Sequence, residues 1–547
     1  MGIDRSVEER LARLAPDQRD AATAAPGPIL CVAPAGSGKT TTLVARIAWL
    51  LASGAARPGA VAAITFNKRA AVELEERLAT AVAPLGLDAD AVRVRTFHAL
   101  GLEVLRAAGR PVEPLVDRMA LLRRVAPDVG PPGWRRLDTA FSKLKLDLGV
   151  TAADVGSDPD PGPIARAFLA YEAELASEAG LDFDDLVARS LRLLESDDRV
   201  LGEWRSRCRD LLVDEAQDLD RAQLQLALLL AAPANRIFLV GDDDQSIYGW
   251  RLADVRRVLA LADALPDLRR VDLVVNYRCP AIVIDRAVRL IERNVERFAK
   301  TIRARDDAPG AVVLAADGGD EVVRARRVLA SWGAADGTRA FLTRTNRELL
   351  PAIAAALEEG VSFRPPPVEL LVGLPEVDAC LDAVERTTDA AAPLLARLEA
   401  VRASWAGQPA DPAADPETLP QAAVAAAVLS WAAGCRDVAA LRAAIAARRT
   451  ALAELCRDDA DLTFATAHAT KGLEFDHVAV LGMERNRFPS ARSLADAPDP
   501  SRALEEERRL AYVAWTRARR SLTLVYDPAA PSPFLLEAFE PGELGAI

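Results

Sequence analysis

Residues 33–40, APAGSGKT, form a glycine-rich segment of the kind that can hold phosphate groups. An apolar run (28–33) precedes this segment and a helical pattern follows it, which is the context that a phosphate-binding loop requires. The glycines would let backbone N–H groups point at phosphate oxygens, at the positive end of a helix. Lys39 would reach the β- and γ-phosphates, and the Thr40 hydroxyl would bind Mg²⁺. The segment therefore predicts a nucleotide site.

Two adjacent acids end another apolar run, in LLVDEAQD (211–218). A strand that ends there would place Asp214 at the carboxyl edge of a sheet, where it could hold Mg²⁺, and Glu215 could polarise an attacking water. An acidic surface turn is the alternative interpretation of this segment alone. The glycine-rich segment upstream favours the catalytic interpretation.

Two arginines could supply the positive charge that phosphoryl transfer needs at the γ-phosphate. Arg278 lies in NYRCP just past an apolar run, and Arg517 lies in YVAWTRAR on a helix that we expect to begin near Glu505. Each arginine taken alone is more typical of a surface or salt-bridging residue. The longer strings around them favour a catalytic role.

The segment LVGDDDQSIYGWRL (239–252) combines carboxylates with aromatic residues. Acids are expected beside a nucleotide, whereas Tyr248 and Trp250 are typical of a surface that grips nucleobases. For Trp250 alone, a core tryptophan is the alternative. One short loop would thus serve both a nucleotide and a nucleic acid.

Short apolar runs that end in polar or glycine-bearing turns predict the strands that position these residues. One set of runs spans 28–33, 60–65, 210–215, 236–241 and 271–275, and a second set spans 339–343, 462–466, 477–482 and 521–526. Near-continuous apolar strands that alternate with helices indicate parallel sheets covered on both faces. Two such sets predict an α/β chain with two sheet domains.

Each set of strands is interrupted by a span that predicts a mainly helical insertion. We expect a first domain at 1–95 and 190–275 with an insertion at 96–189, and a second domain at 276–363 and 460–547 with an insertion at 364–459. The second insertion contains GQPADPAADPETLP (407–420). Proline and aspartate clusters of this kind predict a loop.

The composition limits the class of protein. Half of the 547 residues are hydrophobic and 27% are charged, which indicates a globular chain. The N-terminus lacks a secretory pattern and no apolar run reaches the ~20 residues that span a bilayer, so we expect no membrane partner. Six scattered cysteines argue against a zinc site and fit a reducing cytoplasm. The net charge of −12 disfavours a polyanionic partner for the chain as a whole, although nucleic-acid affinity depends on the local groove.

A series of strings in this chain resembles the UvrD/Rep/PcrA group of superfamily 1 DNA helicases. In chain order these strings are LAPDQRDAA, APAGSGKT, ITFNKRAA, TFHALGL, LDFDDLV, LVDEAQD, VGDDDQSIYGWR, NYR, TAHATKGLEFDHVAVLG and EEERRLAYVAWTRAR. The resemblance covers residues from about 10 to 360 and from 460 to 530. It implies a motor of two RecA-like domains with P-loop nucleotide chemistry, which binds ATP and Mg²⁺ in the cleft between them.

The resemblance also implies roles for individual residues. Gln18 would recognise the adenine edge, Tyr277 would stack on its ring, and Glu474 would contact the ribose. The expected nucleotide-binding set is Gln18, Ala35, Gly36, Ser37, Gly38, Lys39, Thr40, Thr41, Tyr277, Arg278, Glu474 and Arg517. The expected catalytic set is Lys39, Glu215, Gln245, Arg278 and Arg517, with Gln245 and the two arginines converging on the γ-phosphate, and Thr40 and Asp214 as the Mg²⁺ ligands.

The same resemblance implies contacts with single-stranded DNA. Phe66, His98, Tyr248, Trp250, Arg251 and His468 form the expected DNA-binding set. In such motors Gln245 senses the γ-phosphate while aromatic side chains a few residues further on stack against bases, so one loop couples the two ligands. For both histidines, a structural residue that caps a turn is the alternative.

Several departures from the family pattern bear on function. Thr41, Leu252 and Val275 stand where the family often has Arg, Gly and Gln, and the second insertion is short. The first hypothesis is an ATP-dependent helicase that tracks 3′ to 5′ on single-stranded DNA and acts at junctions with duplex, in repair or replication. The alternatives are a translocase that strips proteins with little unwinding, the motor subunit of a helicase–nuclease assembly with a repair or nuclease partner, and a nucleotide-switched binding module without turnover.

Overall fold

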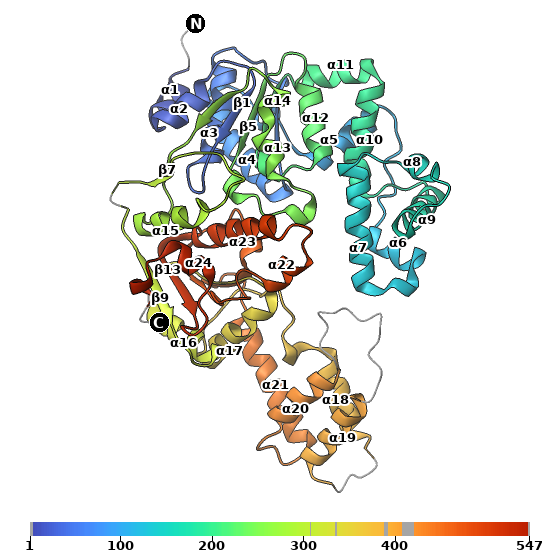
Figure 1. Cartoon of the computed structure of the whole chain (residues 1–547), viewed down its shortest axis with the longest axis vertical. Helices are drawn as coiled ribbons and strands as arrows, with labels where there is room; N and C mark the ends of the chain where they lie inside the picture. The colour runs from blue at the N-terminus through green and yellow to red at the C-terminus, as the bar shows by residue number, and fades with distance from the viewer. Residues whose placement is uncertain (1–3, 307, 334–335, 388–391, 407–420, 545–547) are drawn as a thin grey trace.

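Two parallel sheets organise the chain, one above the other in Figure 1, and a computed structural model describes residues 4–306, 308–333, 336–387, 392–406 and 421–544. The strands are β1 (Ile29–Val32), β2 (Val61–Thr65), β3 (Arg93–Thr96), β4 (Asp210–Val213), β5 (Ile237–Gly241), β6 (Arg269–Asp272), β7 (Val275–Asn276), β8 (Arg303–Ala304), β9 (Ala311–Ala316), β10 (Arg339–Thr343), β11 (Leu462–Thr466), β12 (Phe475–Val480) and β13 (Ala518–Tyr526). The first sheet has the order β3-β2-β4-β5-β1-β6 and the second has the order β11-β10-β12-β13-β9. The predicted α/β class with two parallel sheets is confirmed.

Helices cover both faces of the first sheet (Figure 1). Ile29 and Cys31 of β1 lie in one core with α1–α4, whereas Leu30 and Val32 lie in another core with α5 and α10–α14, because successive strand residues point to opposite faces. These helices are α1 (Arg5–Ala12), α2 (Pro16–Thr23), α3 (Lys39–Ala52), α4 (Lys68–Val82), α5 (Phe97–Ala107), α10 (Phe183–Ser196), α11 (Asp198–Arg207), α12 (Arg221–Ala231), α13 (Val255–Leu259) and α14 (Leu261–Ala264).

A helical unit lies beside the first sheet, on the right of Figure 1, and has a core of its own. It contains α6 (Arg118–Val125), α7 (Gly130–Ser142), a π-helical turn (Lys143–Asp147), α8 (Ala152–Gly156) and α9 (Pro163–Ser177). Aromatic rings from α7 and α9 form the centre of this core, where Phe141 lies 5.2 Å from both Phe168 and Tyr171. Helix α5, which precedes the unit, packs on the sheet instead.

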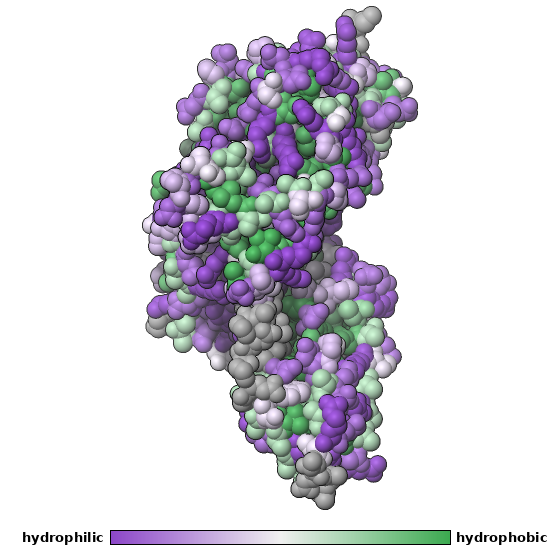
Figure 2. All heavy atoms as spheres, turned by 90° about the vertical axis from the view of Figure 1, so that its right-hand side faces the viewer, coloured by the Kyte–Doolittle hydropathy of each residue, from purple (hydrophilic) through white to green (hydrophobic). Residues whose placement is uncertain are grey.

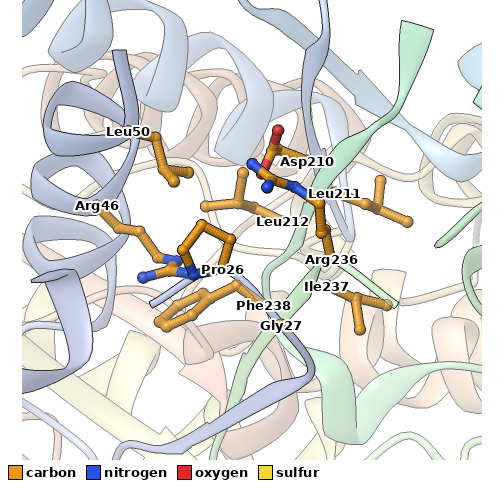
Figure 3. Close-up of a pocket in the computed structure, with 10 residues that line it drawn as sticks. All are labelled: Pro26, Gly27, Arg46, Leu50, Asp210, Leu211, Leu212, Arg236, Ile237 and Phe238. Atoms are coloured by element: carbon orange, nitrogen blue, oxygen red, sulfur yellow. The ribbon is translucent and has the colours of Figure 1, made fainter. Parts of the chain in front are cut away.

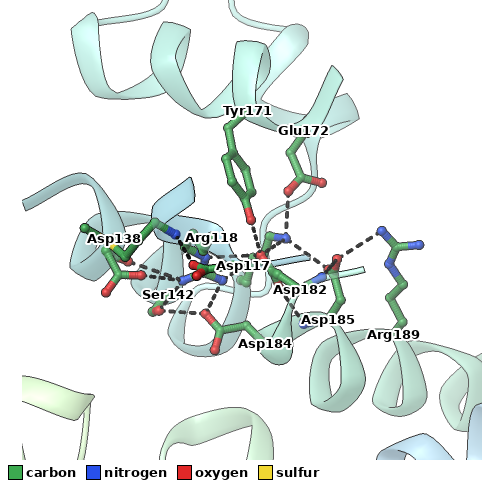
Figure 4. Close-up of polar contacts among 12 residues, drawn as sticks. Asp117, Arg118, Asp138, Ser142, Tyr171, Glu172, Asp182, Asp184, Asp185 and Arg189 are labelled. Carbon is green, nitrogen blue, oxygen red and sulfur yellow. Dashed lines mark hydrogen bonds and ion pairs between the residues drawn. The ribbon is translucent and has the colours of Figure 1, made fainter. Parts of the chain in front are cut away.

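A buried ionic cluster joins this helical unit to α10 (Figure 4). Asp182, at the N-terminus of α10, accepts hydrogen bonds from Arg118 (2.7 Å), Lys145 (2.9 Å) and the hydroxyl of Tyr171 (2.8 Å). Lys145 also pairs with Glu172 of α9 at 2.7 Å. Breaking such a buried pair by removing one partner costs about 3–5 kcal/mol, so the cluster fixes how the unit sits on α10.

The second sheet also has helices on both faces. Leu342 and Val480 lie in a core with α15, α23 and α24, whereas Phe341 and Ala479 lie in a core with α16 and α17. The bounds are α15 (Ala281–Ile291), α16 (Glu321–Trp332), α17 (Leu350–Glu358), α22 (Ala491–Asp496), α23 (Pro500–Trp515) and α24 (Pro533–Ala538).

Four further helices form a separate lobe at the lower end of Figure 1. They are α18 (Pro375–Glu385), α19 (Leu394–Ala406), α20 (Gln421–Trp431) and α21 (Val438–Leu455), and they share one apolar core. Figure 2 shows polar and apolar residues interspersed over the body, and a notch in the outline that sets this lobe apart. The predicted loop at 407–420 lies outside the described residues.

One strand prediction needs correction, and three strands were not predicted. The run 271–275 is not one strand, because the chain leaves the first sheet after Asp272 and pairs again as β7 with β8 in a two-stranded ribbon. β3, β8 and β9 were not predicted. β3 and β9 are edge strands with partly exposed residues; arginines interrupt the apolar pattern of β3, whereas β9 is a continuous apolar run that the sequence reasoning overlooked. Within the described residues, no helix is long and apolar enough to cross a membrane.

Candidate functional site

The segment 33–40 is a loop between β1 and α3, as the sequence predicts. Gly36 and Gly38 have φ of +65° and +84°, a left-handed backbone that suits glycine. Lys39 folds back over the loop and donates a hydrogen bond from Nζ to the carbonyl oxygen of Ala33 (2.9 Å). The buried Ser37 hydroxyl has no hydrogen-bond partner. The loop thus presents a cation, a helix N-terminus and an orphaned hydroxyl in one place, which fits a phosphate group.

Gln18 lies against this loop from α2. Its Nε2 donates to the carbonyl oxygen of Ser37 (2.8 Å), and its Oε1 accepts from the backbone N–H of Ala15 (3.1 Å). Ala35 and Ser37 are buried, whereas Thr40 is half-buried and Thr41 is exposed at the start of α3. The predicted nucleotide residues of the first half of the chain therefore gather at one edge of the sheet.

Asp214 and Glu215 follow β4 at that same edge, because β1, β4 and β5 are parallel neighbours. Burial, followed by the neighbouring Glu215, raises the pKa of Asp214 to about 7. Burial also acts to raise the pKa of Glu215, but Lys471 and Lys39 outweigh it and the pKa is lowered. Glu215 has a left-handed φ of +51°, which holds its side chain where the strand ends.

Gln217 links these acids to the next strand, a connection that the sequence reasoning missed. It is fully buried, its Nε2 donates to Glu215 Oε2 (2.6 Å), and its Oε1 accepts from the backbone N–H of Asp242 (2.9 Å). The only sequence signal was its place within DEAQD.

Arg517 reaches this edge from the second half of the chain, from the turn between α23 and β13 and not from a helix as predicted. It is 1% exposed, and its Nη2 donates to Oε1 of Gln245 (3.2 Å). Its other partners are the carbonyl oxygens of Val513 and Leu473 and the hydroxyl of Thr516. No carboxylate of the described chain pairs with this guanidinium, and burial lowers its pKa to about 9. A buried cation without an anion is a natural site for a phosphate oxygen.

The NYR string contacts the glycine-rich loop directly. The backbone N–H of Tyr277 donates to the carbonyl oxygen of Gly36 (2.9 Å), and a side chain at Gly36 would meet Arg278 Cβ at 2.7 Å. The Tyr277 ring is 42% exposed, and the Arg278 guanidinium pairs with Glu474 at 2.7 Å. Asn276, which the sequence reasoning left without a role, is buried and donates from Nδ2 to the carbonyl oxygen of Ala35 (2.6 Å).

Two cationic side chains hold the acidic loop after β5, and neither was assigned a role in the sequence analysis. Lys300 pairs with Asp242 (2.9 Å), Asp243 and Asp244 (3.0 Å), and Arg297 forms two hydrogen bonds with Asp244 (3.0 and 2.9 Å). Burial acts to raise the pKa of Asp242, but Lys300 and Lys39 lower it to about 2. Asp242 in turn accepts from Gln245 Nε2 (2.5 Å), which orients the amide that faces Arg517.

Lys471 makes a second bridge between the halves. Its side chain is 7% exposed, pairs with Asp218, and donates to the carbonyl oxygen of Gln245 (2.7 Å). Its ammonium also lies 5.0 Å from the centre of the Tyr248 ring. Residues of both sheet domains therefore form hydrogen bonds with the loop that contains Gln245.

The aromatic residues that follow Gln245 form a continuous surface. Phe66 and Tyr248 stack at 5.2 Å with an interplanar angle of 9°, and Trp250 lies 6.2 Å from Tyr248. Trp250 is 57% exposed, which excludes the alternative of a core tryptophan, and the Arg251 guanidinium lies 4.5 Å from the centre of its ring. Leu252, at the end of this loop, has φ of +67°, a strain of about 1–2 kcal/mol where the family often has glycine.

The two histidines lie in different places. His98 is beside the ring of Phe183 (5.4 Å), which is 58% exposed and was not predicted as a site residue. Burial, partly offset by Asp184, lowers the pKa of His98. His468 lies in the turn after β11, and burial and then Arg344 lower its pKa to about 4. In the described residues no ring contact or hydrogen bond joins His468 to Phe66, Tyr248 or Trp250.

A small pocket between Arg46, Asp210 and Arg236 lies away from all of these residues (Figure 3). It sits at the amino ends of β4 and β5, opposite the edge that carries the loops described above. Arg46 donates to the carbonyl oxygens of Ala21 and Ala24 and lies 4.8 Å from the ring of Phe238. These contacts fit a structural role that ties α2 and α3 to the sheet.

Known proteins resemble this chain over most of its length. The UvrD/REP helicase N-terminal domain matches residues 14–128 and 138–266, and the UvrD-like helicase C-terminal domain matches residues 443–528. DNA helicase II of Escherichia coli is 29% identical, over 93% of this chain and 84% of the relative. ATP-dependent DNA helicase UvrD2 of Mycobacterium tuberculosis is 32% identical, over 94% of this chain and 78% of the relative. The two parallel-sheet domains are RecA-like motor domains, and the chain belongs to the UvrD/Rep family of DNA helicases.

Proposed function

We propose that this chain is an ATP-dependent DNA helicase that tracks 3′ to 5′ along single-stranded DNA and separates duplex at junctions. The observation that carries this proposal is the position of Gln245. It accepts a hydrogen bond from the buried Arg517 of the second domain, and it lies three residues before the half-buried Tyr248 and five before the exposed Trp250. One loop therefore faces both ligands, as a motor requires. The polarity is proposed from family membership.

In the proposed mechanism, ATP binds between the two domains. The backbone N–H groups of residues 35–40 and Lys39 hold its phosphates, while Gln18 and Tyr277 hold the adenine at the outer end of the site. Asp214 and the Thr40 hydroxyl would hold Mg²⁺, which would supply positive charge to the phosphates. Both residues offer oxygen donors, which suit Mg²⁺.

Glu215 is the proposed base for the attacking water, and Arg517, Arg278 and Gln245 face the γ-phosphate. The lowered pKa of Glu215 keeps it ionised at neutral pH, as a group that accepts a proton must be. Arg278 would exchange its bond with Glu474 for the phosphate, which frees Glu474 for the ribose. Loss of the γ-phosphate after hydrolysis would release Arg517 and let the two domains separate.

Single-stranded DNA is the proposed substrate of the aromatic surface. Phe66, Tyr248 and Trp250 would stack on bases, Arg251 would hold the backbone, and His98 would extend the surface beside Phe183. Stacking stabilises binding by about 1–3 kcal/mol per base and accepts any sequence. His468 remains a proposed DNA contact that would bind as a neutral ring, since its pKa is far below 7.

A translocase with little unwinding is the second candidate. The observation that favours it is the modest four-helix lobe α18–α21, whose core is separate from both motor domains. In either case we propose a cytoplasmic enzyme of repair or replication, in line with its six free cysteines. A repair or nuclease protein is the proposed partner.

Strand displacement on 3′-tailed and 5′-tailed duplexes, measured beside ATP hydrolysis with and without single-stranded DNA, tests these proposals. We expect single-stranded DNA to stimulate hydrolysis and the 3′-tailed duplex to be separated. Product from the 5′-tailed duplex alone would contradict the polarity. Stimulated hydrolysis without separated strands would favour the translocase. A rate of hydrolysis that is the same with and without DNA would contradict both the helicase and the translocase proposals.

A further inference from the structure

Arg257 of α13 lies where the aromatic loop, the catalytic acids and the helical unit meet. Its Nη1 donates to the carbonyl oxygen of Leu252, the residue that ends the aromatic loop, and to that of Leu219 (3.3 Å), which follows the DEAQD segment. Its Nη2 pairs with the carboxylate of Asp147. One planar guanidinium thus bridges three segments, a geometry that suits arginine and not lysine.

Asp147 is the last residue of the π-helical turn that ends α7. Other residues of this turn face two ways. Lys145 enters the acidic cluster around Asp182 in the helical unit, whereas Leu146 is buried in the core of the first sheet, against which Leu252 also packs. π-helical turns are rare and are frequent at functional sites. The turn is therefore a short link that contacts both the helical unit and the motor domain.

We infer that Arg257 is a positioning residue that ties the aromatic loop to the helical unit through Asp147. This inference rests on the proposed function. When Gln245 and Arg517 change partners at the γ-phosphate, the loop moves, and the carbonyl of Leu252 carries that movement to Arg257. The ion pair then transmits the movement to the turn 143–147. The helical unit, which packs beside Phe183 of α10, would therefore move together with Trp250. Both charged side chains are about one fifth exposed, so they can be replaced without opening a core.

The test compares Arg257→Ala, Asp147→Asn and the double variant with two matched controls. Arg256→Ala removes an exposed arginine of the same helix that pairs with Asp254. Arg221→Ala removes an arginine whose one side-chain hydrogen bond in the described residues is to the backbone carbonyl of Asp147 (3.2 Å). Three quantities are measured in each protein: basal ATP hydrolysis, strands separated per ATP, and the emission of 2-aminopurine in single-stranded DNA, which reports stacking.

We expect basal hydrolysis and the melting temperature to stay near those of the wild type in every variant. Strands separated per ATP should fall about fivefold to tenfold in Arg257→Ala and in Asp147→Asn, and no further in the double variant, because residues in one link are not additive. Unchanged coupling in both single variants, or additive losses, would overturn the inference. A loss of melting temperature with unchanged coupling would assign Arg257 a structural role only.

The failure of the proposed function would look different. A wild-type chain that neither separates strands nor hydrolyses ATP with DNA would contradict the helicase proposal. If the wild type hydrolyses ATP on DNA but separates no strands, the 2-aminopurine signal still decides: we expect the change in stacking on adding ATP to be lost in Arg257→Ala and retained in Arg256→Ala.

Discussion

Arg517 of the second motor domain donates a hydrogen bond to Gln245 of the first across 3.2 Å, and both side chains are buried. The guanidinium has no carboxylate partner in the described chain, so its charge is only partly compensated. A buried charge that costs free energy in the absence of a ligand is a feature of a ligand site and not of a contact that stabilises the fold.

Replacing Arg517 should therefore separate activity from stability. We expect Arg517→Met to lower DNA-stimulated kcat by about 10³-fold, the low end for a cation that stabilises phosphoryl transfer. The melting temperature should stay the same or rise, because an apolar side chain avoids the cost of burying charge. Arg520→Met, which removes an exposed arginine three residues away that pairs with Asp476, is the control and should change neither quantity.

Lys39→Ala should abolish ATP turnover and leave part of the DNA affinity. The ammonium folds over the loop and would contact the β- and γ-phosphates, and among the described residues it makes no cation–π contact with Phe66 or Trp250. Hydrolysis assays and fluorescence anisotropy with a labelled oligonucleotide measure the two properties. Turnover within about tenfold of the wild type would contradict the proposed role of this loop.

Trp250→Ala should keep basal ATP hydrolysis and impair movement on DNA. The exposed indole contributes stacking of about 1–3 kcal/mol per base, so DNA affinity should fall by roughly tenfold or more. Trp250→Phe keeps an aromatic face and should retain much of the activity. Normal unwinding by the alanine variant would refute the coupling proposed for residues 245–250.

Lys300→Met should destabilise the protein by about 3–5 kcal/mol, because it leaves three buried carboxylates short of a cation. Lys300→Met combined with Asp243→Asn removes one positive and one negative charge, and should recover part of that loss. Arg297→Met is the matched variant, since Arg297 contacts only Asp244 in this loop. Urea denaturation of the four proteins measures the difference, and equal effects of Lys300→Met and Arg297→Met would show that Asp242 does not depend on Lys300.

The lowered pKa of His468 predicts that the free energy of unfolding depends on pH. Its folded pKa of about 4 lies below the ordinary value of 6.5, so it contributes stability that is present above pH 6.5 and is lost as the pH falls toward 4. We expect the unfolding free energy of the wild type to fall more steeply across this window than that of His468→Gln. Parallel curves for the two proteins would contradict the lowered pKa. The chain has three histidines, so NMR titration can assign the pKa directly.

The sequence predicted the parts of this site whose signals are local. A glycine-rich segment after a strand, and two acids at the end of another, carry their geometry in neighbouring residues, and the structure brings Lys39 and Asp214 to one sheet edge. The roles of Gln217, Asn276 and Lys300 could not be predicted, because each depends on a partner brought close only by the tertiary fold. β3 was not predicted for a related reason. Its Arg93 and Arg95 interrupt the apolar pattern, and they are accommodated in the strand by ion pairs with Glu103 of α5 that only the tertiary fold forms.

The three aspartates 242–244 also set a limit on how this protein can be divided for study. Lys300 and Arg297 come after α15, well beyond Asp272, where the last strand of the first sheet ends. A recombinant fragment that ends at that strand would contain every phosphate-loop residue. It would lack the two cations that pair with its buried aspartates. The ATP-binding half is thus completed by chain that belongs, in sequence, to its neighbour, and a useful expression boundary lies past residue 300.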